Sequence, residues 1–231
     1  MMAEVIIALD LPSGAEALRL LDRVPEARWV KVGSILMTRE GPDLVRTLVR
    51  RGLSVFLDLK WHDIPNTVSE AVGAARELGV ALATVHTLGG ARMMAAAVAS
   101  AGADLKLIGV TVLTSHDATS YARAIGRPEM DLLAEVERQS VEALEAGLAG
   151  LVCSPREVAA VRHRLGPQAL IVVPGIRRGS DPEGDQIRVA TAADAVAAGA
   201  THLVIGRPIL QAGDAGAAFR GFVEEAQCVG S

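Results

Sequence analysis

Short apolar runs alternate eight times with longer segments of helical period along this chain. The alternation predicts parallel strands joined by crossover helices, because a parallel connection must cross the sheet and a helix usually makes that crossing. The predicted strands are residues 5–9, 29–32, 54–59, 82–86, 107–113, 148–153, 170–173 and 203–205. Eight such units within 231 residues predict an α/β fold of the (β/α)8 TIM barrel type.

Glycines mark the expected ends of the helices between those strands. The predicted helical segments include residues 15–23, 43–51, 68–78 and 132–146. Where helices should end, the sequence has Gly52, Gly79, Gly102, Gly147 and Gly199, as a left-handed C-terminal cap requires. No linker or low-complexity tract interrupts the pattern, so residues 1–231 are predicted to form a single domain.

Charge and cysteine content exclude several classes of protein. The formal net charge is −4 and the pI is near 5.8, so the chain lacks the basic footprint of a nucleic-acid-binding protein. Its two cysteines, Cys153 and Cys228, have neither disulfide-framework nor metal-site spacing, which favours a reducing compartment. The longest uncharged stretch, residues 78–91, falls short of the roughly 18 to 20 residues that span a bilayer. The first ten residues lack the basic flank of a signal peptide. We therefore expect a cytoplasmic protein that binds neither nucleic acid nor membrane.

Polar residues gather at the carboxyl ends of the predicted strands, where barrel enzymes carry their reactive groups. They are Asp10, Lys31, Asp58, Lys60, His86, Thr114, Ser115, Gly206 and Arg207. Each one alone is best explained by a structural ion pair or hydrogen bond. Together they predict a charged cavity, because charges at neighbouring strand ends are costly to bury unless they pair with each other or with a ligand.

The densest polar stretch is residues 56–68, FLDLKWHDIPNTV. Asp58 and Lys60 are two positions apart on a strand and should point to the same side, with Lys31 on the adjacent strand. In such an array each charge keeps its neighbour ionised, which leaves a protonated amine able to donate a proton in a closed pocket. Asp63 follows in a turn with Pro65 that should direct it away from the strand axis, towards the barrel mouth or a partner subunit.

The run D-x-K-x-x-D-I-P-N-T resembles the active-site motif of the orotidine 5′-phosphate decarboxylase family. Further blocks similar to that family occur in order along nearly the whole chain: ALD at 8–10, KVG at 31–33, TVLTS at 111–115, PGIR at 174–177, GDQ at 184–186 and VIGRPI at 204–209. Departures from the family pattern are Trp61, Leu11 and Ala192, which affect packing rather than charge. The resemblance implies cofactor-independent, metal-free decarboxylation of orotidine 5′-phosphate to uridine 5′-phosphate in pyrimidine biosynthesis.

The same resemblance implies roles for individual residues. The catalytic residues would be Lys31, Asp58, Lys60 and Asp63, with Lys60 stabilising the carbanion and donating a proton to it. Asp10, Lys31, Asp63 and Thr67 would surround the ribose, and Thr114 and Ser115 would contact the pyrimidine. Arg177, Gln186, Gly206 and Arg207 would lie on the phosphate side, within or near the polar loop 177–188, which we expect to order over bound nucleotide. Asp63 and Thr67 would be donated to the opposite subunit of a homodimer.

Two other functions fit parts of the pattern. A metal-dependent sugar-phosphate decarboxylase or aldolase of the same suprafamily would share the D-x-K-x-x-D frame, but an acidic metal ligand would then be expected where Lys31 stands. A catalytically silent nucleotide-binding barrel would keep the phosphate residues without turnover. His86 is interpreted as a neutral, hydrogen-bonded histidine more readily than as a catalytic base, and Cys153 as a core residue.

Overall fold

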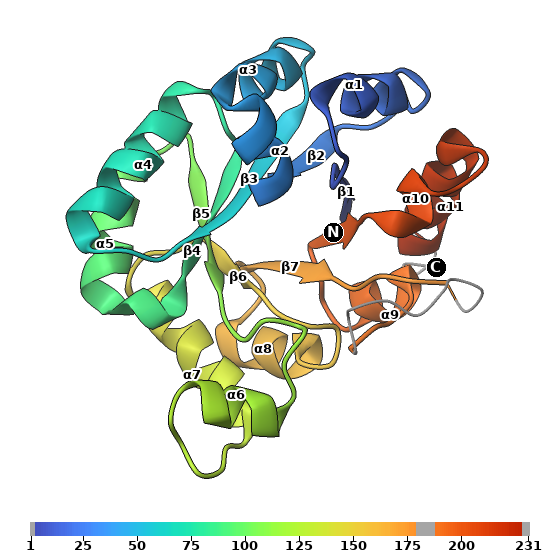
Figure 1. Ribbon diagram of the computed structural model, residues 1–231. Coiled ribbons are helices and arrows are strands. Elements are labelled where there is room, and N and C mark those ends of the chain that lie inside the picture. Colours follow the sequence, from blue (N-terminus) through green and yellow to red (C-terminus); the bar gives the residue numbers. More distant parts are fainter. Residues whose placement is uncertain (1–2, 179–187, 228–231) are drawn as a thin grey trace.

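The computed structural model describes residues 3–178 and 188–227 and shows a closed barrel of eight parallel strands in sequence order, with β8 paired to β1 (Figure 1). This confirms the predicted fold class. The strands are β1 Glu4–Ala8, β2 Trp29–Gly33, β3 Ser54–Trp61, β4 Leu82–His86, β5 Lys106–Val110, β6 Gly150–Val152, β7 Leu170–Pro174 and β8 His202–Ile205.

Alternation along the strands separates two apolar layers. One set of side chains fills the barrel interior: Ile6, Ala8, Phe56, Leu82, Ile108, Val172 and Val204. Their neighbours along the strands, such as Ile7 and Leu57, pack instead against the surrounding helices. Lys31 pairs in register with Phe56, and Asp58 lies two positions beyond Phe56 on the same strand. Because alternate residues of a strand point to the same side, both charged side chains face the barrel interior, as Phe56 does. The pleat thus directs them into the barrel at its carboxyl end.

Helices form the outer ring seen in Figure 1. They are α1 Gly14–Asp22, α2 Ser34–Glu40, α3 Pro42–Arg50, α4 Pro65–Glu77, η1 Thr87–Gly89, α5 Gly90–Ala101, α6 Ala118–Ala124, α7 Leu132–Glu145, α8 Val158–Leu165, α9 Ala192–Ala197, α10 Arg207–Leu210 and α11 Ala215–Gln227. Their starts are chemically marked: the Asp131 side chain caps α7, and Pro42 and Pro65 open α3 and α4, where a missing backbone N–H costs nothing. The five glycines predicted to end helices all have positive φ, between 62° and 109°.

The fifth strand is shorter than predicted, because it ends at Val110 and not at residue 113. Its neighbour β6 also covers fewer residues than the predicted 148–153, and the pairing of Val110 with Val152 is the last in the register. Beyond it, the Thr111 hydroxyl donates to the Val152 carbonyl oxygen over 2.9 Å, and Val112 stays buried outside any strand. The apolar residues Val112 and Leu113 made this stretch resemble a strand in the sequence, although Leu113 is 38% exposed.

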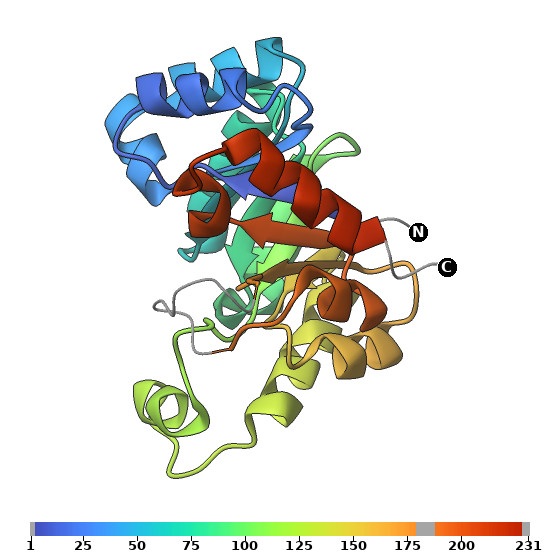
Figure 2. The same ribbon diagram turned by 90° about the vertical axis from the view of Figure 1, so that its right-hand side faces the viewer.

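Figure 2 shows α6 at the periphery, beyond the ring of helices, at the end of the barrel toward which the β8 arrow points. The segment between β5 and α7 therefore makes an excursion that starts at the carboxyl end of the strands. Among the described residues, no helix is long and apolar enough to cross a membrane.

Candidate active site

A cavity of about 720 Å³ opens at the carboxyl ends of the strands, within the range typical of small-molecule sites. Nine of the predicted site residues line it: Asp10, Lys31, Asp58, Lys60, Thr114, Ser115, Arg177, Gly206 and Arg207. Asp63 and Thr67 do not line it; both are exposed, and an Asp63 oxygen accepts a hydrogen bond from the Ile64 backbone N–H over 2.6 Å. Gln186 and most of the 177–188 loop lie outside the described residues.

Four charged side chains form a continuous chain on one side of the cavity. The Lys31 ammonium donates to Asp10 Oδ1 over 3.0 Å and lies 3.6 Å from Asp58 Oδ2. The other Asp58 oxygen accepts from the Lys60 ammonium over 2.8 Å. Signs therefore alternate from Asp10 through Lys31 and Asp58 to Lys60. The three-residue array expected from the sequence is present, and Asp10 extends it.

The environment of Asp58 keeps its carboxylate ionised. Burial alone raises the pKa of Asp58, but the charges of Lys31 and Lys60 and the hydrogen bonds from Lys60 and Thr84 outweigh it, so the pKa lies below its ordinary value. The Asp58 side chain is only 12% exposed, whereas that of Lys60 is 40% exposed. Asp58 thus acts as a fixed anion at the wall, and Lys60 carries its ammonium from that wall into the accessible space.

Lys60 owes its position to an irregular backbone rather than to a regular pleat. Its φ of 52° is the one positive value at a non-glycine residue among the described residues, and the β3–β4 register shifts between Leu57 and Trp61. Its backbone N–H donates to the Thr84 hydroxyl over 2.8 Å, outside the strand ladder. The two side chains meet as predicted, but their convergence depends on this distortion. Strain of this kind persists where surrounding contacts hold it, and it concentrates at functional sites.

Sequence reasoning missed two residues that hold this array in place. Thr84 donates its hydroxyl to Asp58 Oδ1 over 3.1 Å while accepting the Lys60 N–H, so one buried side chain fixes both partners. A threonine in a predicted strand gives no signal, because β-branched residues are common there. Gly33 was noticed only within a motif. A Cβ at that position would lie 3.0 Å from Lys31 Nζ and 3.4 Å from Asp10 Oδ1, so the ammonium needs the space that glycine leaves.

The opposite side of the cavity is apolar at the strands. Val110, Val152, Val172 and Val204 line it, and polar groups appear only in the segments beyond the strands, at positions such as Thr114 and Arg207. An apolar wall facing a charged wall gives a bound molecule one polar and one nonpolar surface to contact.

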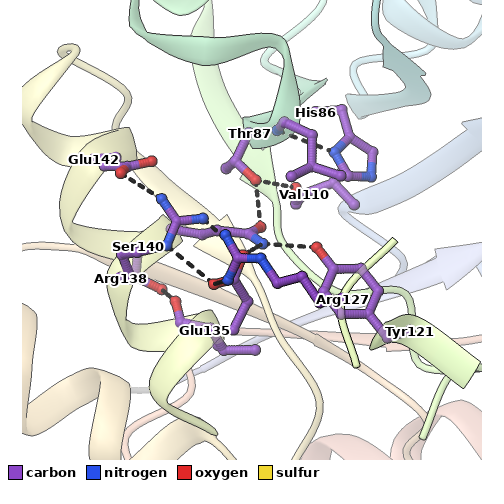
Figure 3. Close-up of polar contacts among 12 residues, drawn as sticks. His86, Thr87, Val110, Tyr121, Arg127, Glu135, Arg138, Ser140 and Glu142 are labelled. Carbon is purple, nitrogen blue, oxygen red and sulfur yellow. Dashed lines mark hydrogen bonds and ion pairs between the residues drawn. The ribbon is translucent and has the colours of Figure 1, made fainter. Parts of the chain in front are cut away.

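A buried polar network supports the end of β5 beneath that wall. The Thr87 hydroxyl, after β4, contacts both the Val110 carbonyl oxygen at 2.9 Å and Gln139 Oε1 on α7 at 2.6 Å. The Gln139 amide in turn donates to Tyr121 of α6 and to Glu135. Figure 3 shows Thr87, Tyr121 and Glu135 converging from three parts of the chain. The network ties the α6–α7 excursion to a strand end that lines the cavity.

His86 lies beside the site but does not line the cavity. It stacks on His62 with a ring separation of 5.4 Å, and its Nδ1 accepts from the Leu88 N–H over 3.3 Å. Burial, together with the charges of His62 and Lys60, lowers the pKa of His86 to about 4. The structure therefore agrees with the interpretation of His86 as a neutral histidine. Cys153 is buried, as expected of a core residue. Within residues 3–178 and 188–227, no group of three or more His, Cys, Asp or Glu could hold a metal ion.

Comparison with known proteins gives consistent matches over nearly the whole chain. The sequence model of the "Orotidine 5'-phosphate decarboxylase / HUMPS family" matches residues 3–222. The chain is 49% identical over 219 residues to an orotidine 5′-phosphate decarboxylase of Anaeromyxobacter sp. (strain K), covering 94% of this chain and 95% of that one. It is 51% identical over 215 residues to a protein of the same name from Alkalilimnicola ehrlichii, covering 91% and 90%. The crystal structure of orotidine 5′-phosphate decarboxylase from Lactobacillus acidophilus superposes with a TM-score of 0.87 at 34% identity, covering 97% of this chain and 99% of that one.

Proposed function

Because this chain belongs to the orotidine 5′-phosphate decarboxylase / HUMPS family, we propose that it removes the carboxylate of orotidine 5′-phosphate to form uridine 5′-phosphate. The activity is that of a carboxy-lyase, and it would serve pyrimidine biosynthesis. The observation that carries the proposal is the Lys60 ammonium, held 2.8 Å from an ionised Asp58 and facing the cavity.

The proposed chemistry uses Lys60 twice. Breaking the bond between C6 and the carboxylate releases CO₂ and leaves the electron pair on C6, in the ring plane, where the pyrimidine ring cannot delocalise it. A fixed ammonium stabilises that carbanion electrostatically. The proton of Lys60 then passes to C6, and the neutral amine regains a proton from water. Asp58 would hold Lys60 in position and face the departing carboxylate, while Lys31 keeps Asp58 ionised.

The rest of the substrate would lie along the cavity. We place the ribose beside Asp10 and Lys31, the pyrimidine against Thr114 and Ser115, and the phosphate near Arg177, Gly206 and Arg207. The family resemblance also assigns Gln186, outside the described residues, to the phosphate. A guanidinium next to a backbone N–H suits a phosphate dianion. Because the phosphate is remote from C6, its binding energy would serve to orient the substrate and exclude water.

We further propose that the enzyme acts as a homodimer in which Asp63 and Thr67 complete the partner's site. Both side chains are exposed and absent from the lining of their own cavity. Ile64, between them, is 67% exposed, the largest exposed fraction among the large hydrophobic side chains of the described residues. A two-fold interface would bring the same loop of each chain to the other's cavity and would cover Ile64.

The metal-dependent alternative is disfavoured by the position of Lys31. Its ammonium lies between the Asp10 and Asp58 carboxylates, at 3.0 Å and 3.6 Å, where a divalent cation would meet a fixed positive charge. We propose no metal and no cofactor. We also propose that residues 1–231 act as one domain in the cytoplasm, in keeping with a sequence that has only two cysteines and no disulfide-framework spacing.

One assay tests the proposal. Purified protein is incubated with orotidine 5′-phosphate, and substrate loss and uridine 5′-phosphate formation are measured together, with and without a chelator. We expect stoichiometric conversion at equal rates in both conditions. Activity that requires Mg²⁺ would point to the sugar-phosphate reaction class, and tight binding without conversion would point to a silent nucleotide-binding barrel.

A further inference from the structure

A buried ion pair lies beside the cavity, on its apolar side. Arg188 and Glu157 are each 5% exposed, and Arg188 Nη1 is paired with Glu157 Oε1. The other Glu157 oxygen accepts from the Ser154 backbone N–H over 2.7 Å, so the carboxylate is fixed at the turn after β6. Neither residue lines the cavity.

Arg188 also reaches across to the segment that follows β5. Its Nη2 donates to the Leu113 carbonyl oxygen over 3.0 Å, a contact between residues 75 positions apart in the sequence. Leu113 lines the cavity and directly precedes Thr114 and Ser115, which line it too. The same carbonyl oxygen accepts the His116 N–H over 3.0 Å, so it closes the turn that carries those two residues.

The segment that follows β5 is anchored at several points along its length. Its start is tied down twice, by Thr87 at the Val110 carbonyl and by the Thr111 hydroxyl at Val152. Beyond Thr111 the chain has left the sheet, and Arg188 supplies the side-chain hydrogen bond to the backbone of Leu113. A guanidinium suits this task, because its rigid fork can bind a carboxylate and a carbonyl oxygen at once.

Stability alone is a weak explanation for the pair. Desolvation of two charges offsets much of their attraction, and apolar replacements of buried ion pairs are often neutral or stabilising. Here the cost is increased, because Arg188 Nε and the Ser154 hydroxyl are buried without a hydrogen-bond partner among the described residues. The geometry offers another explanation, in the link from Glu157 through Arg188 to the edge of the cavity.

We propose that Arg188 is a positioning residue: held by Glu157, it fixes the Leu113 carbonyl and so places Thr114 and Ser115 against the substrate. The inference rests on the proposed decarboxylation, in which these two residues contact the pyrimidine. Losing the anchor should therefore lower kcat/KM by about tenfold, the equivalent of one hydrogen bond to a charged group. The loss should be equal for orotidine 5′-phosphate and for orotidine, because both contain the pyrimidine.

Three variants separate positioning from stability. Arg188→Met removes the anchor and leaves Glu157 buried and unpaired, so both the melting temperature and kcat/KM should fall. Arg188→Met with Glu157→Gln removes both charges, so the melting temperature should recover while kcat/KM stays low. Arg188→Lys can pair with Glu157 but lacks the fork needed to reach Leu113, and it should behave like the double variant.

Arg162→Met is the matched control. Arg162 also holds backbone carbonyl oxygens, donating to Gly166 and Gly199, but it does not line the cavity or contact the segment after β5. Its loss should lower the melting temperature and leave kcat/KM unchanged. Hydrogen exchange over residues 111–117, which needs no activity, should be faster in all three Arg188 variants and unchanged in the control.

The outcomes are distinct. Wild-type protein that fails to convert orotidine 5′-phosphate counts against the proposed function, whatever the exchange data show. Wild-type kcat/KM and slow exchange in the double variant and in Arg188→Lys would overturn the positioning role and leave Arg188 as part of a structural ion pair.

Discussion

The two halves of the barrel contribute to the cavity in different ways. From β1 to β4 the strands and the short segment after β1 supply charged side chains, namely Asp10, Lys31, Asp58 and Lys60, which are joined by direct contacts of 3.6 Å or less. From β5 to β8 the strands supply valines, and polar groups such as Thr114 and Arg207 come from the segments beyond the strand ends.

The residues proposed to carry out the reaction are therefore held in place differently from the residues proposed to recognise the substrate. Charges on neighbouring strands are positioned by the pleat and the ladder, which fixes distances between reacting groups. Segments beyond the strands depend on added anchors, such as the Thr111 hydroxyl at the Val152 carbonyl and Arg188 at the Leu113 carbonyl. We therefore expect changes in the first half to abolish turnover and changes in the second to weaken recognition by smaller factors.

The largest effect is expected from Lys60→Ala. It removes both the charge that stabilises the carbanion and the proton for C6, so kcat should fall by about 10⁴-fold or more while the melting temperature stays close to that of the wild type. Lys106→Ala is the control, since Lys106 is an exposed lysine at the amino end of β5, whereas the cavity opens at the carboxyl ends of the strands. Substantial turnover by Lys60→Ala, measured in the same assay, would remove the basis for placing chemistry on β3.

Mixing two inactive variants tests whether the charged half is completed by the partner subunit. Lys60→Ala and Asp63→Ala should each be severely impaired alone. If Asp63 serves the partner's site, a mixed dimer has one intact site, and random reassortment of equal amounts should restore about a quarter of wild-type activity. Rates are measured after subunit exchange has been verified with differently tagged chains.

The control mixture is Lys60→Ala with Asp58→Ala. Both residues lie on one strand and contact each other within a subunit, so every site in a mixed dimer lacks one of them and no activity should return. Recovery in both mixtures, or in neither, would contradict donation of Asp63 across the interface.

A smaller effect is expected from Arg207→Ala, in the second half. Loss of a guanidinium beside the phosphate should lower kcat/KM for orotidine 5′-phosphate by about 10²-fold and have little effect on orotidine, which has no phosphate. Arg220→Ala is the control, because Arg220 forms an exposed ion pair with Glu26 on the outer surface. Equal losses on both substrates would mean that Arg207 acts on the reacting end of the molecule.

The sequence was sufficient for the barrel and for most of the charged half, for a physical reason. Period-two alternation places Lys31 and Asp58 in the interior, and glycines with positive φ end the helices where the pattern changes. The sequence did not predict the features that depend on tertiary contacts. Val112 is buried without belonging to a strand, and Thr84 and Arg188 act through partners far away in sequence. The roles of Asp63 and Thr67 depend on a second subunit and stay predictions.

The smallest effect concerns how far the charge of Lys60 extends. The pKa of both His86, at the end of β4, and His202, in β8, is lowered to about 4, mainly by burial. The charges of His62 and Lys60 contribute at His86, whereas the charge of Lys106 contributes at His202. Between pH 6.5 and 4 the unfolded chain binds protons that these folded histidines do not, so the stability they contribute is full above that window and falls as the pH drops through it.

In Lys60→Ala the repulsion at His86 is removed, so NMR titration should show a raised pKa for His86 and an unchanged pKa for His202. The stability loss attributable to His86 should then be smaller in urea unfolding at pH 5 than in the wild type. A shift of both histidines, or of neither, would show that the charged array is not confined to the first half of the barrel as its contacts indicate.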